Sequence, residues 1–214
     1  EWWTAHNRIF AKTILKQRND PLIIPFKPLI LIFVQCNIAA LLLTSNWQYI
    51  MTSNPDFLIK DGSFINGTWH SEGEATFDVH NPADGSLVKS LIDASDADLE
   101  AAIAAANAAQ PAWRAKTAEE RAIILRRWYE LLLEHQDALA LILTREQGKP
   151  LAEARGEVAY GASYVQWFAE EAKRAYGEVI PATLPDRRIV TTKEPIGVVA
   201  AITPWNFPTA MITR

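Results

Sequence analysis

The sequence predicts an α/β fold, in which an antiparallel β region precedes three long helices and the first strand of a parallel sheet. Three observations support this prediction. Residues 57–92 hold short alternating apolar segments separated by turn residues, which is typical of antiparallel strands. Residues 95–177 repeat apolar side chains at helical spacing. Residues 195–204 form a β-rich apolar run without polar alternation, which is typical of a strand buried on both faces.

The antiparallel region is predicted from its turns. Asn66 and Gly67 lie between apolar residues and give a strong signal for a two-residue hairpin. Residues 81–85 read Asn-Pro-Ala-Asp-Gly, in which proline fixes its own φ and glycine accepts a positive φ. The segments on either side of this second turn, 74–79 and 86–92, are therefore predicted to be strands.

The first two helices are expected to begin at capping signals. Ser95 with Asp98, and Thr117 with Glu120, have the spacing of a capping box, in which two side chains satisfy free N–H groups of the first turn. Pro111 is expected to end the first helix, because proline cannot donate the backbone hydrogen bond that a helix interior requires.

Glycine and proline also mark the later helix boundaries. The second helix is expected to end at Gly148, and the third to run from Pro150 to Gly177. Gly161 lies on the apolar face of the third helix, where glycine costs about 1 kcal/mol relative to alanine. Close approach of another element at Gly161 is the expected compensation.

The apolar period changes after the third helix. Residues 189–193 are predicted to be a half-exposed strand, and residues 195–204 the buried one. Pro208 suits the first turn of a further helix. A parallel strand needs a parallel neighbour that is reached through a crossover helix. Because the sequence stops at Arg214, inside that crossover, the chain is expected to be truncated.

Composition excludes several classes of function. The chain has 214 residues and a formal net charge of −4, so it has no basic excess for binding a nucleic-acid backbone. Cys36 is the only cysteine, which excludes an internal disulfide framework and a cysteine-rich zinc site. The histidines are scattered without metal-ligand spacing: His6, His70, His80 and His135.

Residues 1–50 differ in composition from residues 51–214. They contain no glycine and hold five basic and two acidic side chains, whereas the rest of the chain holds 16 basic and 23 acidic ones. Their apolar run, residues 29–43, is shorter than the roughly 20 residues of a membrane-spanning helix. Three readings stay open: a non-native leader such as translated upstream sequence, a membrane anchor or signal centred on residues 22–43, and a native extension.

Few residues are candidates for chemistry. Asn206 stands where the buried strand turns into a helix, and its amide could donate a hydrogen bond to a developing oxyanion. The alternative is that Asn206 is a local turn or cap residue. Cys36 lies in the apolar leader and is expected to act as a small hydrophobe, whereas Glu170 and Glu171 are expected on a solvated helix face.

Several longer motifs together resemble a known family. They are Ile65-Asn-Gly-Thr-Trp69, Asn81-Pro-Ala-Asp-Gly85, Pro111-Ala-Trp-Arg114, Glu146-Gln-Gly-Lys-Pro-Leu-Ala-Glu153, Trp167-Phe-Ala-Glu-Glu-Ala-Lys-Arg-Ala-Tyr-Gly177 and Pro195-Ile-Gly-Val-Val-Ala-Ala-Ile-Thr-Pro-Trp-Asn-Phe-Pro208. Through them, residues 51–214 resemble the amino-terminal part of the aldehyde dehydrogenase superfamily, most closely the succinate-semialdehyde dehydrogenases. The resemblance implies an N-terminal fragment of that fold, including the first strand of its Rossmann-like parallel sheet.

The resemblance implies roles for six residues. Asn206 matches the asparagine that stabilises the thiohemiacetal oxyanion, and Arg214 matches an arginine that pairs with the distal carboxylate of the substrate. A guanidinium suits that task because its planar fork binds a carboxylate through two hydrogen bonds. The residues that match the nicotinamide–ribose wall of the cofactor site are Ile202, Thr203, Pro204 and Trp205.

The resemblance also implies what this chain lacks. In the family, the nucleophilic cysteine, the general-base glutamate, the adenine-ribose lysine and the glycine loop follow later in the sequence. The sequence thus predicts a fragment of a cytoplasmic NAD- or NADP-dependent enzyme that oxidises succinate semialdehyde or a similar aldehyde, is homo-oligomeric when complete, and is inactive as this chain alone. The alternative is a non-catalytic, membrane-tethered helical interaction protein that is anchored through residues 22–43.

Overall fold

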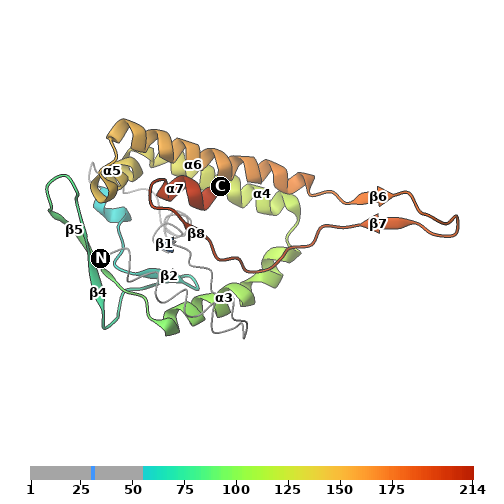
Figure 1. Ribbon diagram of the computed structural model, residues 1–214, viewed down its shortest axis with the longest axis horizontal. Helices are drawn as coiled ribbons and strands as arrows, with labels where there is room; N and C mark the ends of the chain where they lie inside the picture. Colours follow the sequence, from blue (N-terminus) through green and yellow to red (C-terminus); the bar gives the residue numbers. More distant parts are fainter. Residues whose placement is uncertain (1–29, 32–54) are drawn as a thin grey trace, which may run out of the picture.

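The computed structural model describes residues 30–31 and 55–214, and Figure 1 shows their arrangement. Most of the leader therefore lies outside the described residues, as do the anchor or signal reading of residues 22–43 and the interpretation of Cys36. Among the helices of the described part, none combines the length and apolarity needed to cross a bilayer.

The molecule is built on one long helix, α6 (Leu151–Glu171), against which three other helices pack. These are α4 (Ala118–Glu134), α5 (Gln136–Gln147) and the short α7 (Pro208–Thr213). Figure 1 shows α3 (Asp96–Ala115) on the opposite side of the molecule from α6. The main buried cluster joins α4, α5 and α6 to the 3₁₀ turn Pro55–Leu58. Its members are Leu58, Leu132, Leu139, Ala140, Leu143, Ala154, Val158, Ala162 and Val165.

The two predicted antiparallel hairpins are present. Strand β2 (Ser63–Ile65) pairs with β3 (Thr68–His70), and the turn residues Asn66 and Gly67 have φ values of 50° and 83°. Both values are positive, as the predicted two-residue turn requires. The second hairpin pairs β4 (Thr76–His80) with β5 (Leu87–Ile92).

Both predicted capping boxes are confirmed. The Ser95 hydroxyl accepts a hydrogen bond from the Asp98 N–H, and the Asp98 carboxylate accepts one from the Ser95 N–H at 2.9 Å. Thr117 and Glu120 make the same reciprocal pair at the start of α4. These hydrogen bonds to Ser95 and Thr117 lower the pKa of Asp98 and of Glu120 respectively, because they favour the ionised carboxylates.

Three of the predicted helix boundaries are wrong. Helix α3 continues through Pro111 to Ala115, because proline forfeits only its own N–H bond and leaves those of the following residues intact. The predicted second helix divides at His135, whose backbone (φ −102°, ψ 15°) ends α4 and starts α5. Gly177 follows the end of α6 by several residues and serves the next hairpin, where an added Cβ would lie 1.9 Å from the Thr191 carbonyl oxygen.

The run at 195–204 differs most from its prediction. Only β8 (Ile202–Thr203) is a strand, and it pairs antiparallel with β1 (Ile30–Leu31). Ile196 is 95% exposed. A strand buried on both faces needs parallel neighbours and covering helices, and the described residues supply only two-stranded antiparallel sheets. The α/β class is confirmed, whereas the extent and pairing of this strand are not.

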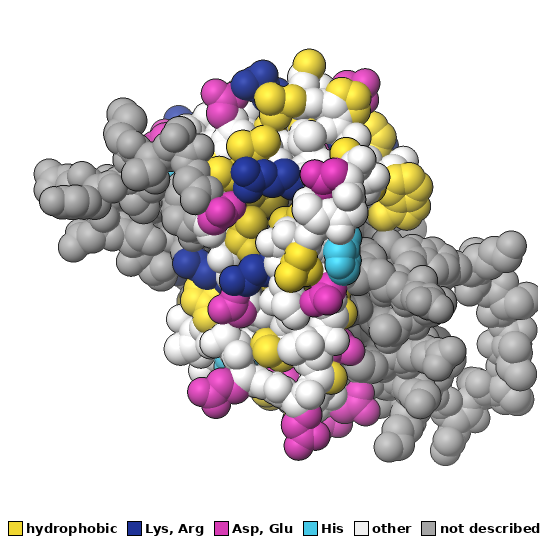
Figure 2. Space-filling view, turned by 90° about the vertical axis from the view of Figure 1, so that its left-hand side faces the viewer, with side chains coloured by type: hydrophobic (Ala, Val, Ile, Leu, Met, Phe, Trp, Pro, Cys, Tyr) yellow, Lys and Arg dark blue, Asp and Glu magenta, His cyan; other side chains and the backbone are white. Residues whose placement is uncertain are grey.

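A two-stranded arm projects from the helical body. A strand within the predicted segment 189–193 is confirmed as β7 (Ile189–Thr191), which is exposed at every residue rather than half-exposed and pairs with β6 (Glu178–Ile180). Figure 1 shows the pair extending away from the body, and every residue in both strands is exposed. At the opposite end, Figure 2 shows basic, acidic and apolar side chains interspersed over one face.

Candidate functional site

The segment that carries the predicted site residues is a strand, a turn and a helix. Strand β8 ends at the buried Thr203, the turn residues are exposed, and Pro208 occupies the first turn of α7. Proline suits that position, because its missing N–H has no intrahelical partner there in any case. The predicted start of a helix at Pro208 is thus confirmed.

Helix α7 rests directly on α6. The expected close approach at Gly161 is confirmed, since a Cβ added there would lie 3.0 Å from Cγ2 of Thr209 and 3.5 Å from Cα of Ala210. Ala210 is fully buried at this contact. Gly161 and Ala210 thus let α6 and α7 pack closely. This contact sets the distance between α6 and the turn that precedes α7.

Two side chains from the end of α5 and the following loop hold the turn by its backbone. Gln147 donates a hydrogen bond from Nε2 to the Trp205 carbonyl at 2.9 Å, and Lys149 donates one from Nζ to the Asn206 carbonyl at 2.8 Å. Gly148, which separates them, has a φ of 80° and caps α5 in the left-handed conformation. This cap lets the chain reverse so that both neighbours reach the turn.

A buried carboxylate completes the attachment. Glu157 on α6 is 3% exposed; its Oε1 accepts the Thr209 N–H at 2.8 Å, and its Oε2 pairs with the ammonium of Lys149. The same ammonium lies 4.1 Å from the centre of the Phe207 ring, within the range of a cation–π interaction. Two charged side chains therefore contact residues 206, 207 and 209.

Asn206, the predicted oxyanion donor, is anchored through its backbone carbonyl, and its side chain is exposed. Asn206 is exposed, and within the described part of the chain its side-chain amide has no hydrogen-bond partner. Among the wall residues, Trp205 is 61% exposed, Pro204 is exposed, Ile202 is half-buried and Thr203 is buried. The Thr203 hydroxyl is buried without a hydrogen-bond partner among the described residues.

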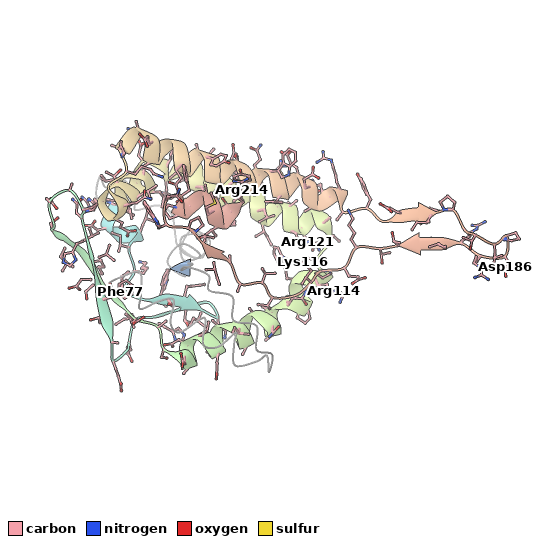
Figure 3. All side chains as sticks on the ribbon, viewed as in Figure 1. Phe77, Arg114, Lys116, Arg121, Asp186 and Arg214 are labelled. Carbon is pink, nitrogen blue, oxygen red and sulfur yellow. The ribbon has the colours of Figure 1, made fainter. Side chains whose placement is uncertain are left out.

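Arg214 lies just beyond α7, at the opposite end of that helix from Asn206 (Figure 3). Two α6 tyrosines, Tyr160 and Tyr164, face each other with ring centres 4.9 Å apart and hydrogen-bonded hydroxyls. That hydrogen bond raises the pKa of Tyr164, and the Arg214 charge opposes the rise. The Arg214 guanidinium is thus within electrostatic range of α6.

The remaining candidates do not join this segment. Glu171 pairs with Arg174 at 3.0 Å in an exposed position, as expected of a solvated helix face. No cluster of three metal-ligating side chains occurs among the residues that the structure describes. Gln147, Lys149 and Glu157 were missed as site residues. The available signal was an acidic residue at position 157 inside the apolar stripe of α6, between Ala154 and Gly161.

Comparison with known proteins identifies the family. The sequence profile of the aldehyde dehydrogenase family matches residues 69–214. The chain is 55% identical over 158 residues to glutarate-semialdehyde dehydrogenase of Pseudomonas putida, and 55% identical over 166 residues to succinate-semialdehyde dehydrogenase [NADP(+)] of Escherichia coli. These alignments cover 73% and 77% of this chain but 33% and 34% of the relatives.

Solved structures agree with this assignment. An aldehyde dehydrogenase of Brucella melitensis biovar abortus matches with a TM-score of 0.73 at 52% identity, over 76% of this chain and 34% of that one. PnpE, solved in complex with nicotinamide adenine dinucleotide, matches with a TM-score of 0.66 at 34% identity over 70% of this chain and 31% of that one. This chain belongs to the aldehyde dehydrogenase family, and it spans about a third of the length of the relatives it matches.

Proposed function

We propose that residues 51–214 form the amino-terminal part of an NAD- or NADP-dependent dehydrogenase that oxidises succinate semialdehyde, or a similar aldehyde with a distal carboxylate, to the acid. One observation carries this proposal: the Asn206 amide is exposed on a turn whose backbone is fixed, and Arg214 lies at the other end of the same short helix.

Asn206 would act on the oxyanion that forms when a nucleophile adds to the aldehyde. Asn206 is exposed and its backbone carbonyl is held by Lys149, and donors fixed before reaction stabilise developing charge without reorganising. Arg214 would bind the distal carboxylate through its fork of N–H donors. This pair would hold the two ends of a semialdehyde in one orientation.

Residues 202–205 would line the nicotinamide–ribose side of the cofactor. The unpartnered Thr203 hydroxyl and the exposed surface of Pro204 and Trp205 suit a ligand that is both polar and flat. The bound nicotinamide would accept a hydride from the substrate. The residues named here would orient and surround it, and none of them supplies the thiol nucleophile that the family resemblance implies. We therefore propose that the chain alone is inactive.

The proposal extends to assembly and location. The complete enzyme would be a homo-oligomer, since the projecting β6–β7 arm exposes apolar side chains, among them Val179 at 80%. It would be cytoplasmic. The alternative of a membrane-tethered interaction protein depends on residues 22–43, which lie outside the described part of the chain.

A chimera tests the proposed chemistry. Residues 69–214 replace the matching segment of the Escherichia coli succinate-semialdehyde dehydrogenase, and NADPH formation is followed by absorbance. Asn206→Ala is expected to lower kcat by about 100- to 1000-fold, because one oxyanion donor is lost. Arg214→Met is expected to raise KM for succinate semialdehyde while leaving KM for the uncharged butyraldehyde unchanged.

The controls separate these roles from folding. Asn107→Ala, at an exposed position of α3 on the opposite side of the molecule from α6 (Figure 1), should leave both rates unchanged, and the isolated 1–214 chain should form no NADPH. An Asn206→Ala chimera with full activity would refute the oxyanion role. An equal effect of Arg214→Met on both aldehydes would refute carboxylate recognition.

A further inference from the structure

The Lys149–Glu157 pair is unusual among the ion pairs of the described residues, because both side chains are almost fully removed from solvent. The exposed fractions of the two side chains are 11% and 1%. By contrast, Arg155 and Asp137, which also link α6 to α5, are 46% and 80% exposed. Desolvating two charges costs several kcal/mol per ion, so such a pair is weak evidence for a role in stability alone.

The Lys149–Glu157 pair makes two hydrogen bonds to the backbone of residues 206–209 that apolar side chains could not make. Glu157 supplies an acceptor for the Thr209 N–H, and Lys149 supplies a donor for the Asn206 carbonyl. Both contacts bridge more than 50 positions of sequence, with separations of 52 and 57 residues. Two methyl-bearing side chains of the same volume could fill the space but could not make either hydrogen bond.

We propose that Lys149 and Glu157 are positioning residues that fix the backbone of the 205–209 turn and so aim the Asn206 amide. The catalytic meaning of this role rests on the proposed function. The pair contacts the turn through the backbone of residues 206 and 209 and through the Phe207 ring. Because these contacts use the backbone, the hydrogen-bonding groups of the Asn206 side chain stay available for a substrate.

Two double variants of the 1–214 chain test the positioning role. Lys149→Met/Glu157→Leu removes both charges and both hydrogen bonds at similar volume. Lys149→Met/Glu157→Gln also removes the charges but keeps a side-chain oxygen that can accept the Thr209 N–H. The matched control is Arg155→Met/Asp137→Asn, which removes an exposed ion pair between α6 and α5.

The readout is amide hydrogen exchange, which involves neither aldehyde nor cofactor. The leucine variant should speed exchange of the Thr209 amide at least tenfold, while residues 158–169 of α6 stay protected. The glutamine variant should restore protection at Thr209 and leave the Met211 amide, which donates to the Phe207 carbonyl, exchanging faster than in the wild type. The control should change neither segment.

Other outcomes contradict the proposal. Equal exchange at Thr209 in the leucine and glutamine variants would refute it, and so would an equal rise throughout α6, which is the signature of a merely structural role. If the leucine variant does not fold, the glutamine variant decides alone, and unchanged exchange at the Met211 amide refutes the proposal.

Kinetics of the glutamine variant in the chimera connect the turn to catalysis. We expect kcat to fall about tenfold with KM for the aldehyde nearly unchanged, since the oxyanion donor is misaimed but the substrate still binds. An unchanged kcat despite faster exchange would refute the link to catalysis. An inactive chimera with the native pair would instead overturn the proposed function and leave the exchange result standing.

Discussion

At the scale of single residues, two neighbouring glutamates have different environments. Glu157 is buried, but its carboxylate is paired with Lys149 and accepts the Thr209 N–H. Glu146, near the end of α5, is desolvated by its surroundings, and burial raises its pKa to about 7. A carboxyl group whose pKa is raised by folding lowers the free energy of unfolding at neutral pH, because the same group ionises at its ordinary pKa in the unfolded chain.

Glu146→Gln is therefore expected to stabilise the chain at high pH only. The folded-state pKa is about 7 and the ordinary value 4.5, so the wild type loses stability as the pH rises through that window. The variant should match the wild type near pH 4 and exceed it by about 1–3 kcal/mol at pH 8. Urea unfolding at both pH values measures this, and a difference that is independent of pH would contradict the assigned pKa.

At the scale of elements, α6 is the platform of the site. Its buried face receives α4 and α5 along its length and α7 at Gly161. Its second glycine, Gly156, is exposed and has no atom within 4 Å of where a Cβ would stand. The two glycines of α6 therefore differ in role: Gly161 makes room for α7, whereas Gly156 faces no packed neighbour.

The two glycines make a matched pair of substitutions. Gly156→Ala should stabilise the chain by about 0.5–1 kcal/mol, because alanine is the better helix former and the new methyl meets nothing. Gly161→Ala should lack this gain, because its methyl would lie 3.0 Å from Cγ2 of Thr209 and push α7 outward. Thermal unfolding of both variants checks the difference, and equal gains would mean that α7 does not rest on α6.

At the scale of the whole molecule, the body and the arm have different relations to solvent. The body buries its leucines and valines between helices, whereas the arm exposes both faces of a two-stranded ribbon. Val179 and Val190 lie directly opposite each other in that ribbon, 80% and 64% exposed. Apolar strands exposed in this way are prone to pair with other chains.

Replacing this pair should reduce self-association. Val179→Glu/Val190→Lys puts opposite charges across the hairpin, which preserves the strand pairing while removing the apolar surface. The variant should elute at a lower apparent mass than the wild type in size-exclusion chromatography with light scattering. Ile123→Lys, at an exposed apolar position on α4, is the control and should not change the mass. An unaltered mass in the arm variant would show that the arm takes no part in association.

The amino-acid sequence alone determined those local features of this protein that depend on a few adjacent residues. Three features depend on residues within a few positions of each other, and they can therefore be predicted without the rest of the fold. They are the Asn66–Gly67 hairpin, the two capping boxes and the left-handed Gly148 cap. The family motifs also predict Asn206 and Arg214 as site residues, and these roles stay proposals.

Only the tertiary structure decided what surrounds those residues. The attachments of the 205–209 turn join residues 52, 57 and 58 positions apart. Among the residues that the structure describes, the segment predicted as a strand at 195–204 has no parallel neighbours to bury it. No local pattern encodes such contacts, because the free energy of a buried charge or a two-sided strand depends on partners that folding brings from elsewhere in the chain.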